Sequence, residues 1–320
     1  MEVRNYLIDS IRLIAALFVI FLHIPLENFN EEFAVHLRLL SRWAVPVFLM
    51  FSGYFVSLKV KKNDAYFISY ITKLLGIILI STLIYVPFAL SNVGLGYFIY
   101  KFDWIFLGAY YHLWFLIALI FSTLVYMFFY MNKIERILDL FSIFLLFFFV
   151  TIMDYGYLFG ITINQNVPLL FLSIFFFNFG THLKQLFSNT LKSKLISILL
   201  LITGVCIQEI EIFFLDGKSS YDPLDFQMLY GTILFSIGVI GCSFSFKQTK
   251  SNWVSKLGMK YALFIYIYHV LLVETFKAFD INGTIVLLSP FIIITISILV
   301  AIILERKLPK IYNILNGEFK

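Results

Sequence analysis

Leu7–His23, LIDSIRLIAALFVIFLH, is long and apolar enough to span a membrane as a helix, yet it contains three ionisable side chains. Such groups cost free energy in a bilayer and usually face a protein interior or a water-filled cavity. Asp9 and Arg12 are three residues apart, so they are neighbours on a helix and can pair. Arg12 and His23 are three turns apart, on one face and about 16 Å apart along the axis. This face carries a fixed cation at one depth and a titratable imidazole at another.

The composition extends this reading from one span to a whole membrane protein. Of the 320 residues, 61% are hydrophobic and 13% are charged, and the mean hydropathy is +0.93. Soluble domains are nearer half apolar and a quarter charged. The many apolar runs that follow disfavour the alternative of a signal anchor with incidental polar residues. The first run also lacks a small-residue cleavage site, which disfavours a cleaved signal peptide. Cys206 and Cys242 lie in apolar runs, with no disulfide or zinc spacing.

Ten apolar stretches of about 20 residues predict an all-α, polytopic membrane helix bundle. Their approximate bounds are 7–25, 43–60, 67–90, 113–131, 137–154, 168–186, 194–214, 227–246, 261–279 and 284–304. The sequence shows no internal repeat, low-complexity tract or soluble segment between them. Residues 1–320 are therefore expected to form one transmembrane domain without an extra soluble domain.

Lys and Arg residues predict the orientation, because cytoplasmic loops are enriched in them. With a cytoplasmic N-terminus and ten spans, all but five of the 24 Lys and Arg residues fall on the cytoplasmic side. Those five are Arg38, Arg42, Lys101, Lys218 and Lys277. Both termini are thus predicted to be cytoplasmic. The basic residues lie in short loops and do not imply nucleic-acid binding. Glu209 and Glu211, at the outer end of the seventh span, are candidates for lining a polar cavity.

Four motifs, in order along nearly the whole chain, resemble those of acyltransferase family 3, whose members transfer acyl groups, mostly acetyl, to bacterial surface glycans. The first is Leu7–His23, with Asp9, Arg12 and the ten residues between Arg12 and His23. The others are Arg42–Phe55 (RWAVPVFLMFSGYF), which contains Ser52 and Tyr54, His112–Leu116 (HLWFL), which contains Trp114, and Ile265–His269 (IYIYH). The chain has no room for the extracytoplasmic esterase-like domain of some members.

The resemblance implies a role for each motif residue. His23 is expected to be the general base, or alternatively a transient acyl carrier, because imidazole titrates near neutral pH. Arg12 and Lys73 are expected to contact the acyl-CoA donor, and Asp9 to hold Arg12. The remaining motif residues are expected to shape the substrate cavity around the reacting centre: Arg42, Ser52, Tyr54, His112, Trp114 and His269. The family's basic pair at the third span is replaced by Tyr70 and Lys73, and a lysine meets a phosphate only as a point charge.

Structural alternatives stay open for these positions. Ser52–Tyr54 also fits a small-residue contact between close helices, and His112 and Trp114 also fit interfacial aromatics. His269 also fits a buried histidine bonded to a backbone carbonyl, and Arg42 a side chain that extends to the outer interface. His36 and His182 lie in no motif and are interpreted as incidental.

The resemblance therefore implies an O-acyltransferase of a bacterial cytoplasmic membrane, with acetyl-CoA as its expected donor. The expected acceptor, implied by the resemblance, is a hydroxyl of a cell-surface or capsular polysaccharide or its lipid-linked precursor. No metal is expected, since no cluster of ligands has the required spacing. The alternative is a transporter or flippase of a glycan precursor, which also needs polar residues in helices. Transporters often have paired Gly- or Pro-broken helices in two matching halves, and the sequence shows no such pairing.

Overall fold

The predicted all-α membrane bundle is confirmed by the computed structural model, which describes residues 4–100, 108, 110–161, 163, 166–215, 226–279 and 283–318. Within these residues eight helices are long and apolar enough to cross a membrane. Two shorter apolar helices, Val167–Thr181 and Tyr230–Ser245, occupy the sixth and eighth predicted spans. The predicted outer loop 216–225 and parts of the loop 155–167 lie outside the described residues.

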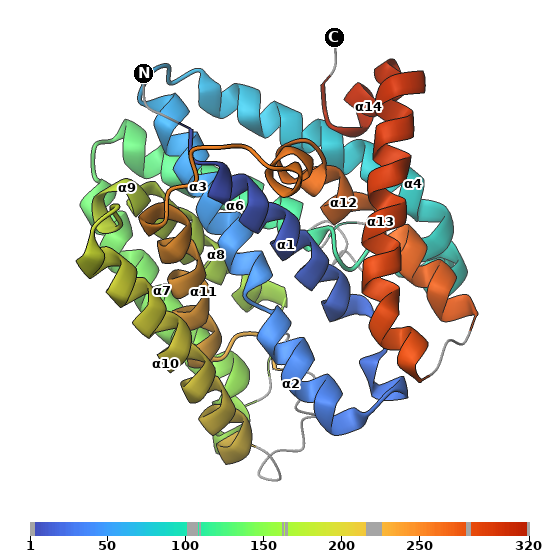
Figure 1. Cartoon of the computed structure of the whole chain (residues 1–320), viewed down its shortest axis with the longest axis horizontal. Helices are drawn as coiled ribbons and strands as arrows, with labels where there is room; N and C mark the ends of the chain where they lie inside the picture. Colours follow the sequence, from blue (N-terminus) through green and yellow to red (C-terminus); the bar gives the residue numbers. More distant parts are fainter. Residues whose placement is uncertain are drawn as a thin grey trace.

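The ten helices that correspond to the predicted spans form the body of the molecule (Figure 1). They are α1 (Tyr6–His23), α3 (Ala44–Val60), α4 (Tyr66–Tyr100), α6 (Trp114–Met131), α7 (Glu135–Asp154), α8 (Asn166–Thr181), α10 (Leu191–Leu215), α11 (Tyr230–Ser245), α12 (Trp253–Ala278) and α13 (Thr284–Lys307). Short elements connect or follow them: η1 (Leu26–Asn28), α2 (Glu31–Ser41), η2 (Gly156–Phe159), α9 (Leu183–Leu186) and α14 (Pro309–Leu315).

Helix α12 begins eight residues before the predicted ninth span, because its start is set by a cap rather than by hydrophobicity. The Asn252 side chain accepts the backbone N–H of Ser255, and the Ser255 hydroxyl accepts the backbone N–H of Asn252. This reciprocal arrangement satisfies two donors that a helix start leaves unpaired.

Helix α2 was expected to be part of an outer loop, and its polarity explains the error. The Asn30 side chain accepts the backbone N–H of Phe33, while acidic residues in the first turn and Arg38 in the last turn complement the helix dipole. Leu39 is buried in a small apolar cluster with Phe226. A helix cap and one apolar face stabilise this helix, and a hydropathy profile detects neither of them.

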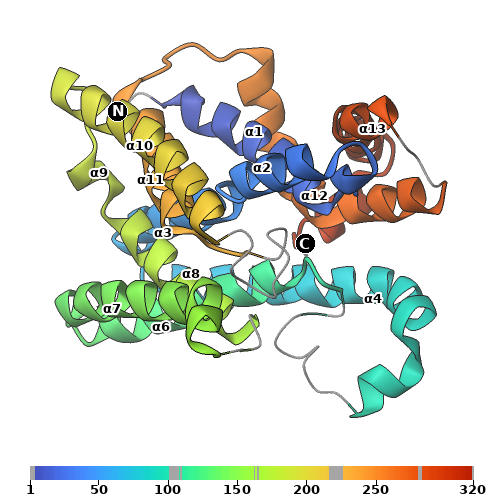
Figure 2. The ribbon, with the colours of Figure 1, turned by 90° about the horizontal axis from the view of Figure 1, so that it is seen from below.

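Close backbone contacts hold the main helix pairs together. A Cβ atom on Gly258 of α12 would overlap the carbonyl oxygen of Asp9 in α1, and one on Gly53 of α3 would overlap the carbonyl oxygen of Phe177 in α8. The small-residue interpretation of Ser52–Tyr54 is therefore right for Gly53. In Figure 2, α6, α7 and α8 lie together on one side and the α10–α11 pair on the other.

The start of α1 and helix α14 lie at the same end of the bundle, the upper end in Figure 1. We call this the lysine-rich end, because the short connections there contain Lys61, Lys62, Lys133, Lys247 and Lys250. His23, the last residue of α1, lies towards the opposite end.

Candidate active site

Three histidines from three of the sequence motifs meet at the end of α1. The ring of His23 stacks on the ring of His269 from α12, with centroids 5.4 Å apart and planes 29° apart. His112, in the turn before α6, lies edge-on to His269 with a centroid distance of 5.9 Å. Residues far apart in the chain are thus brought to one place, which we call the histidine cluster.

Backbone carbonyls fix the tautomer of His269. Its Nδ1 lies 3.0 Å from the carbonyl oxygen of Ile265 and 2.9 Å from that of Tyr266. A ring nitrogen that faces carbonyl oxygens carries the hydrogen, so Nε2 of the neutral ring keeps a free lone pair. Among the described residues this buried Nε2 has no hydrogen-bond partner. The alternative interpretation of His269 as a buried histidine bonded to a carbonyl is therefore correct for Nδ1 but does not account for Nε2.

His112 has the opposite tautomer, and its other ring nitrogen is likewise an acceptor that no described residue donates to. Its Nε2 donates to the carbonyl oxygen of Ile267 at 2.9 Å, which leaves Nδ1 as a buried acceptor without a partner in the described part of the chain. Burial lowers the pKa of His112 to about 3, so the ring is neutral near pH 7. A buried acceptor without a partner is costly. Two such nitrogens, on rings whose centroids are 5.9 Å apart, suit a ligand that donates hydrogen bonds, such as a molecule with hydroxyl groups.

Two tyrosines that the sequence analysis missed complete the surroundings. The Tyr85 hydroxyl donates to the carbonyl oxygen of Ile267 at 2.8 Å, and its ring lies 4.7 Å from that of His112. The ring of Tyr111 lies 5.1 Å from that of His23, and its hydroxyl donates to Glu274 at 3.0 Å. Burial and the nearby Glu274 raise the pKa of Tyr111, so its hydroxyl keeps its proton. In the sequence, the one indication that Tyr111 lies near the histidines was its position directly before the third motif.

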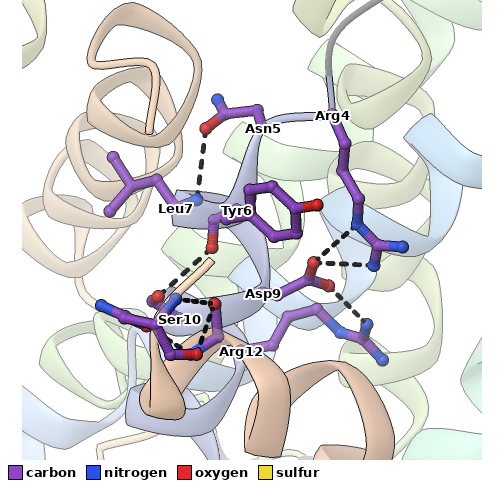
Figure 3. Close-up of polar contacts among 9 residues, drawn as sticks. Arg4, Asn5, Tyr6, Leu7, Asp9, Ser10 and Arg12 are labelled. Atoms are coloured by element: carbon purple, nitrogen blue, oxygen red, sulfur yellow. Dashed lines mark hydrogen bonds and ion pairs between the residues drawn. The ribbon is translucent and has the colours of Figure 1, made fainter. Parts of the chain in front are cut away.

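The predicted pair at the start of α1 is confirmed, and it is part of a larger group (Figure 3). Arg12 Nη1 lies 3.4 Å from Asp9 Oδ1, while Arg4 Nη2 lies 2.7 Å from Asp9 Oδ2. The buried carboxylate of Asp9 thus pairs with two guanidinium groups. Because α1 is continuous from Tyr6 to His23, Arg12 and His23 lie about 16 Å apart along its axis.

A cavity of about 500 Å³ opens beside this group at the lysine-rich end. Arg4, Lys184 and Lys247 contribute positive charge to its lining, and Asp9 and Tyr54 also face it. Three cations against one carboxylate favour an anionic ligand. The sequence analysis counted Lys184 and Lys247 only as indicators of topology.

The model of the acyltransferase domain family matches residues 5–306, a range that includes all three histidines and Asp9. The chain belongs to acyltransferase family 3. The predicted membership is confirmed, and with it a multi-pass membrane enzyme that transfers acyl groups other than amino-acyl groups.

Two curated relatives share part of this acyltransferase sequence. A serine/alanine racemase of Enterococcus gallinarum is 33% identical over 132 residues, which are 38% of this chain and 19% of the relative. An amino-acid racemase of Enterococcus faecalis is 36% identical over 121 residues, 35% of this chain and 16% of the relative. The matched part is thus less than a fifth of each relative's length. No solved structure matches the acyltransferase.

Ser52 and Tyr54 of the acyltransferase lie away from the histidine cluster, contrary to their expected place around the reacting centre. Tyr54 lines the cavity at the lysine-rich end. The Ser52 hydroxyl donates to the carbonyl oxygen of Phe48 and lies within hydrogen-bond reach of Tyr70, which is close to Arg12. The cause is the direction of α3, which begins near the end of α1 and runs back along it. Ten residues of helix separate Ser52 from Arg42 by about 15 Å.

Arg42 and Trp114 lie at the same end of the acyltransferase as His23. Arg42 Nη1 donates to Gln227 Oε1 at 2.7 Å, and the guanidinium is close enough to His23 to interact electrostatically. Trp114 is the first residue of α6, two positions after His112, and it packs edge-on against Phe115.

Lys73 lies one turn after Tyr70 in α4, and its ammonium group is 3.4 Å from Glu318. Tyr70 rather than Lys73 is the α4 side chain beside Arg12. The donor contact expected of Lys73 remains a prediction.

The acidic residues expected to line a polar cavity have structural roles instead. Glu211 accepts the backbone N–H groups of Tyr230 and Gly231 and the hydroxyl of Tyr155, so it caps the start of α11. Glu209 pairs with His36 at 2.7 Å. Within the described ranges, no group of three or more His, Cys, Asp or Glu side chains is arranged to hold a metal ion.

Proposed function

We propose that the acyltransferase moves an acetyl group from cytoplasmic acetyl-CoA to a hydroxyl of a cell-surface or capsular polysaccharide, or of its lipid-linked precursor. The observation that carries the proposal is the pair of unpartnered acceptors, Nε2 of His269 and Nδ1 of His112, beside His23. A sugar with neighbouring hydroxyls supplies the donors that these nitrogens lack. The glycan class of the acceptor follows from the family resemblance.

The donor enters, in this proposal, from the lysine-rich end, which faces the cytoplasm. The phosphates of acetyl-CoA are anionic, and the cavity lined by Arg4, Lys184 and Lys247 matches that charge. Arg12 lies next along α1, paired with Asp9. The slender pantetheine arm then covers the distance of about 16 Å that separates Arg12 from His23 along the helix.

His23 acts as the general base at the far end of this path. It accepts the proton of the acceptor hydroxyl while the hydroxyl oxygen attacks the thioester carbonyl carbon. The carbon–sulfur bond breaks, and His23 returns the proton to the departing thiolate. His269 and His112 hold the acceptor through their free nitrogens and stay neutral.

The test measures O-acetyl groups per repeat unit, and total polymer, on surface glycan from cells with the wild-type chain, His23→Ala or His23→Gln. Loss of a general base typically costs about 10²–10⁴-fold in rate, so both variants are expected to leave glycan with almost no ester. His36→Ala is the control, since that histidine pairs with Glu209 outside the cluster. Full esterification with His23→Ala would refute the mechanism. Loss of polymer with normal esterification of the remainder would favour a transporter.

A further inference from the structure

A groove of about 640 Å³ lies apart from the histidine cluster, between α7 and α11, with α8 beside them. Its lining is mostly apolar and includes Ile143, Phe147, Phe175 and Ile233. None of the residues assigned to acyl transfer lines it. In Figure 2, α7 and α8 lie at the lower left and the α10–α11 pair lies above them.

The groove has a polar end and an apolar end. At the lysine-rich end, Asn178 Nδ2 donates to Asp139 Oδ1 at 2.8 Å, and His182 Nε2 lies 2.9 Å from the same oxygen. At the other end the ring of Tyr230 packs against that of Phe147, with centroids 6.0 Å apart. His182, interpreted as incidental from the sequence, thus belongs to a polar group at the mouth of the groove.

One atom of this polar group is unsatisfied. The Asn178 side chain is buried, with the residue 4% exposed, and its Oδ1 has no hydrogen-bond partner within the described residues. Because Nδ2 already donates to Asp139, Oδ1 is left as an acceptor. Buried amide oxygens are normally hydrogen-bonded, and leaving one unpaired is costly. Together with the carboxylate of Asp139, it gives the mouth of the groove an excess of acceptors.

The length of the groove matches one leaflet of a membrane. Asp139 and Phe147 are eight residues apart in α7, about 12 Å along the axis. The hydrocarbon core of one leaflet is about 15 Å thick. Along this length the apolar rim is open: Ile143 is 46% exposed and Phe147 is 56% exposed. A single acyl chain in the leaflet at the lysine-rich end has the right length, chemistry and access.

We propose that this groove binds one acyl chain of a phospholipid whose headgroup donates hydrogen bonds, an ammonium or hydroxyl group, to Asn178 and Asp139. The apolar wall accommodates the chain, and the headgroup supplies the donor that Asn178 Oδ1 lacks. Phospholipids with a trimethylated ammonium have no such donor and bind less well.

The experiment mixes the detergent-solubilised chain with phospholipids of identical acyl chains and three headgroups: ethanolamine, glycerol and choline. Native mass spectrometry counts the lipid retained. One hydrogen bond is worth about a two- to tenfold preference, so ethanolamine and glycerol lipids are expected to be retained more than choline lipids by this factor. Asn178→Leu is expected to weaken the preference, because only the carboxylate of Asp139 is then left to accept from the headgroup.

A second pair of variants tests the wall without touching the polar group. Ile143→Trp fills the groove and is expected to abolish retention of all three lipids. Phe144→Trp is the matched control, because this neighbour on α7 is 58% exposed and does not line the groove. If the wild type retains lipids of the three headgroups equally, the bound lipid is adventitious only and the proposal is overturned. Equal retention of lipid by Ile143→Trp and Phe144→Trp would overturn it as well. No acyl transfer is measured, so the result is independent of the proposed function.

Discussion

The ring of His23, at the end of α1, lies against the ring of His269, in the middle of α12, with a centroid distance of 5.4 Å. The two rings are held differently. His269 is tied through Nδ1 to carbonyl oxygens of its own helix, whereas His23 is half-buried at a helix end. The fixed ring is therefore placed to orient the other one, and its Nε2 has no hydrogen-bond partner among the described residues.

The role of that nitrogen is tested by His269→Phe, which keeps an aromatic ring against His23 and removes Nε2. We expect the KM for the acceptor to rise about two- to tenfold, the worth of one hydrogen bond, with the KM for the acyl donor unchanged. Steady-state kinetics in lipid nanodiscs with both substrates varied provides the measurement. His36→Phe is the control. An unchanged acceptor KM would mean that Nε2 does not bind the acceptor.

Asp9→Asn tests the charge between Arg4 and Arg12. The buried carboxylate pairs with both guanidinium groups, so its loss leaves two cations close together without an anion between them. We expect a larger fall in the unfolding midpoint than for Arg4→Gln, which leaves the Asp9–Arg12 pair in place. Glu305→Gln, at the partly exposed pair with Lys260, is the control and should cost less than about 1 kcal/mol. Equal effects of Asp9→Asn and Glu305→Gln would contradict the shared-carboxylate arrangement.

The acid sensitivity of the fold is tested at His112. Burial lowers its pKa in the folded state to about 3, below the ordinary value of 6.5, so the unfolded chain takes up this proton at higher pH than the folded chain does. The stability that the neutral ring contributes is complete above about pH 6.5 and is lost as the pH falls towards 3. His112→Gln cannot titrate. Its thermal midpoint should therefore fall less than that of the wild type between pH 7 and 4.5; parallel curves would rule out this contribution.

Gly258→Ala tests the contact between α1 and α12. Alanine normally stabilises a helix interior by about 1 kcal/mol relative to glycine. Here the added Cβ would overlap the carbonyl oxygen of Asp9, so we expect a lower unfolding midpoint and slower acyl transfer, because α12 must shift and carry His269 with it. Lys256→Ala, an exposed change on the same helix, is the control. A variant as stable and active as the wild type would show that the helices can separate without consequence.

Features encoded in one local stretch were predictable from the sequence. The membrane spans follow from runs of apolar residues, and the Asp9–Arg12 pair follows from helical spacing. The three histidines were selected by motif, although their convergence depends on how distant helices pack. Arg4 was missed because it precedes the helix whose periodicity exposed Asp9 and Arg12.

Other features depend on depth and direction, which a single sequence does not encode. Ser52 and Tyr54 were assigned to the reacting centre because they belong to the same motif as Arg42, but the helix between them carries them back towards Arg12. Tyr85 was not distinguishable among 19 tyrosines and 39 phenylalanines, and the place of Tyr111 before a motif did not show which ring it would contact. Only the packing shows which rings reach a histidine.

The backbone contact between Asp9 and Gly258 has a consequence for how the enzyme is made. Helix α1 leaves the ribosome long before its main partner α12, because most of the other described helices lie between the two in the chain. Until then Asp9, Arg12 and the preceding Arg4 must be accommodated without the helix that later packs against Asp9, and His23 has no His269 beside it. A chain that terminates before α12 would therefore insert many helices into the membrane and still contain only two of the three histidines, so the histidine cluster forms only after α12 has been synthesised.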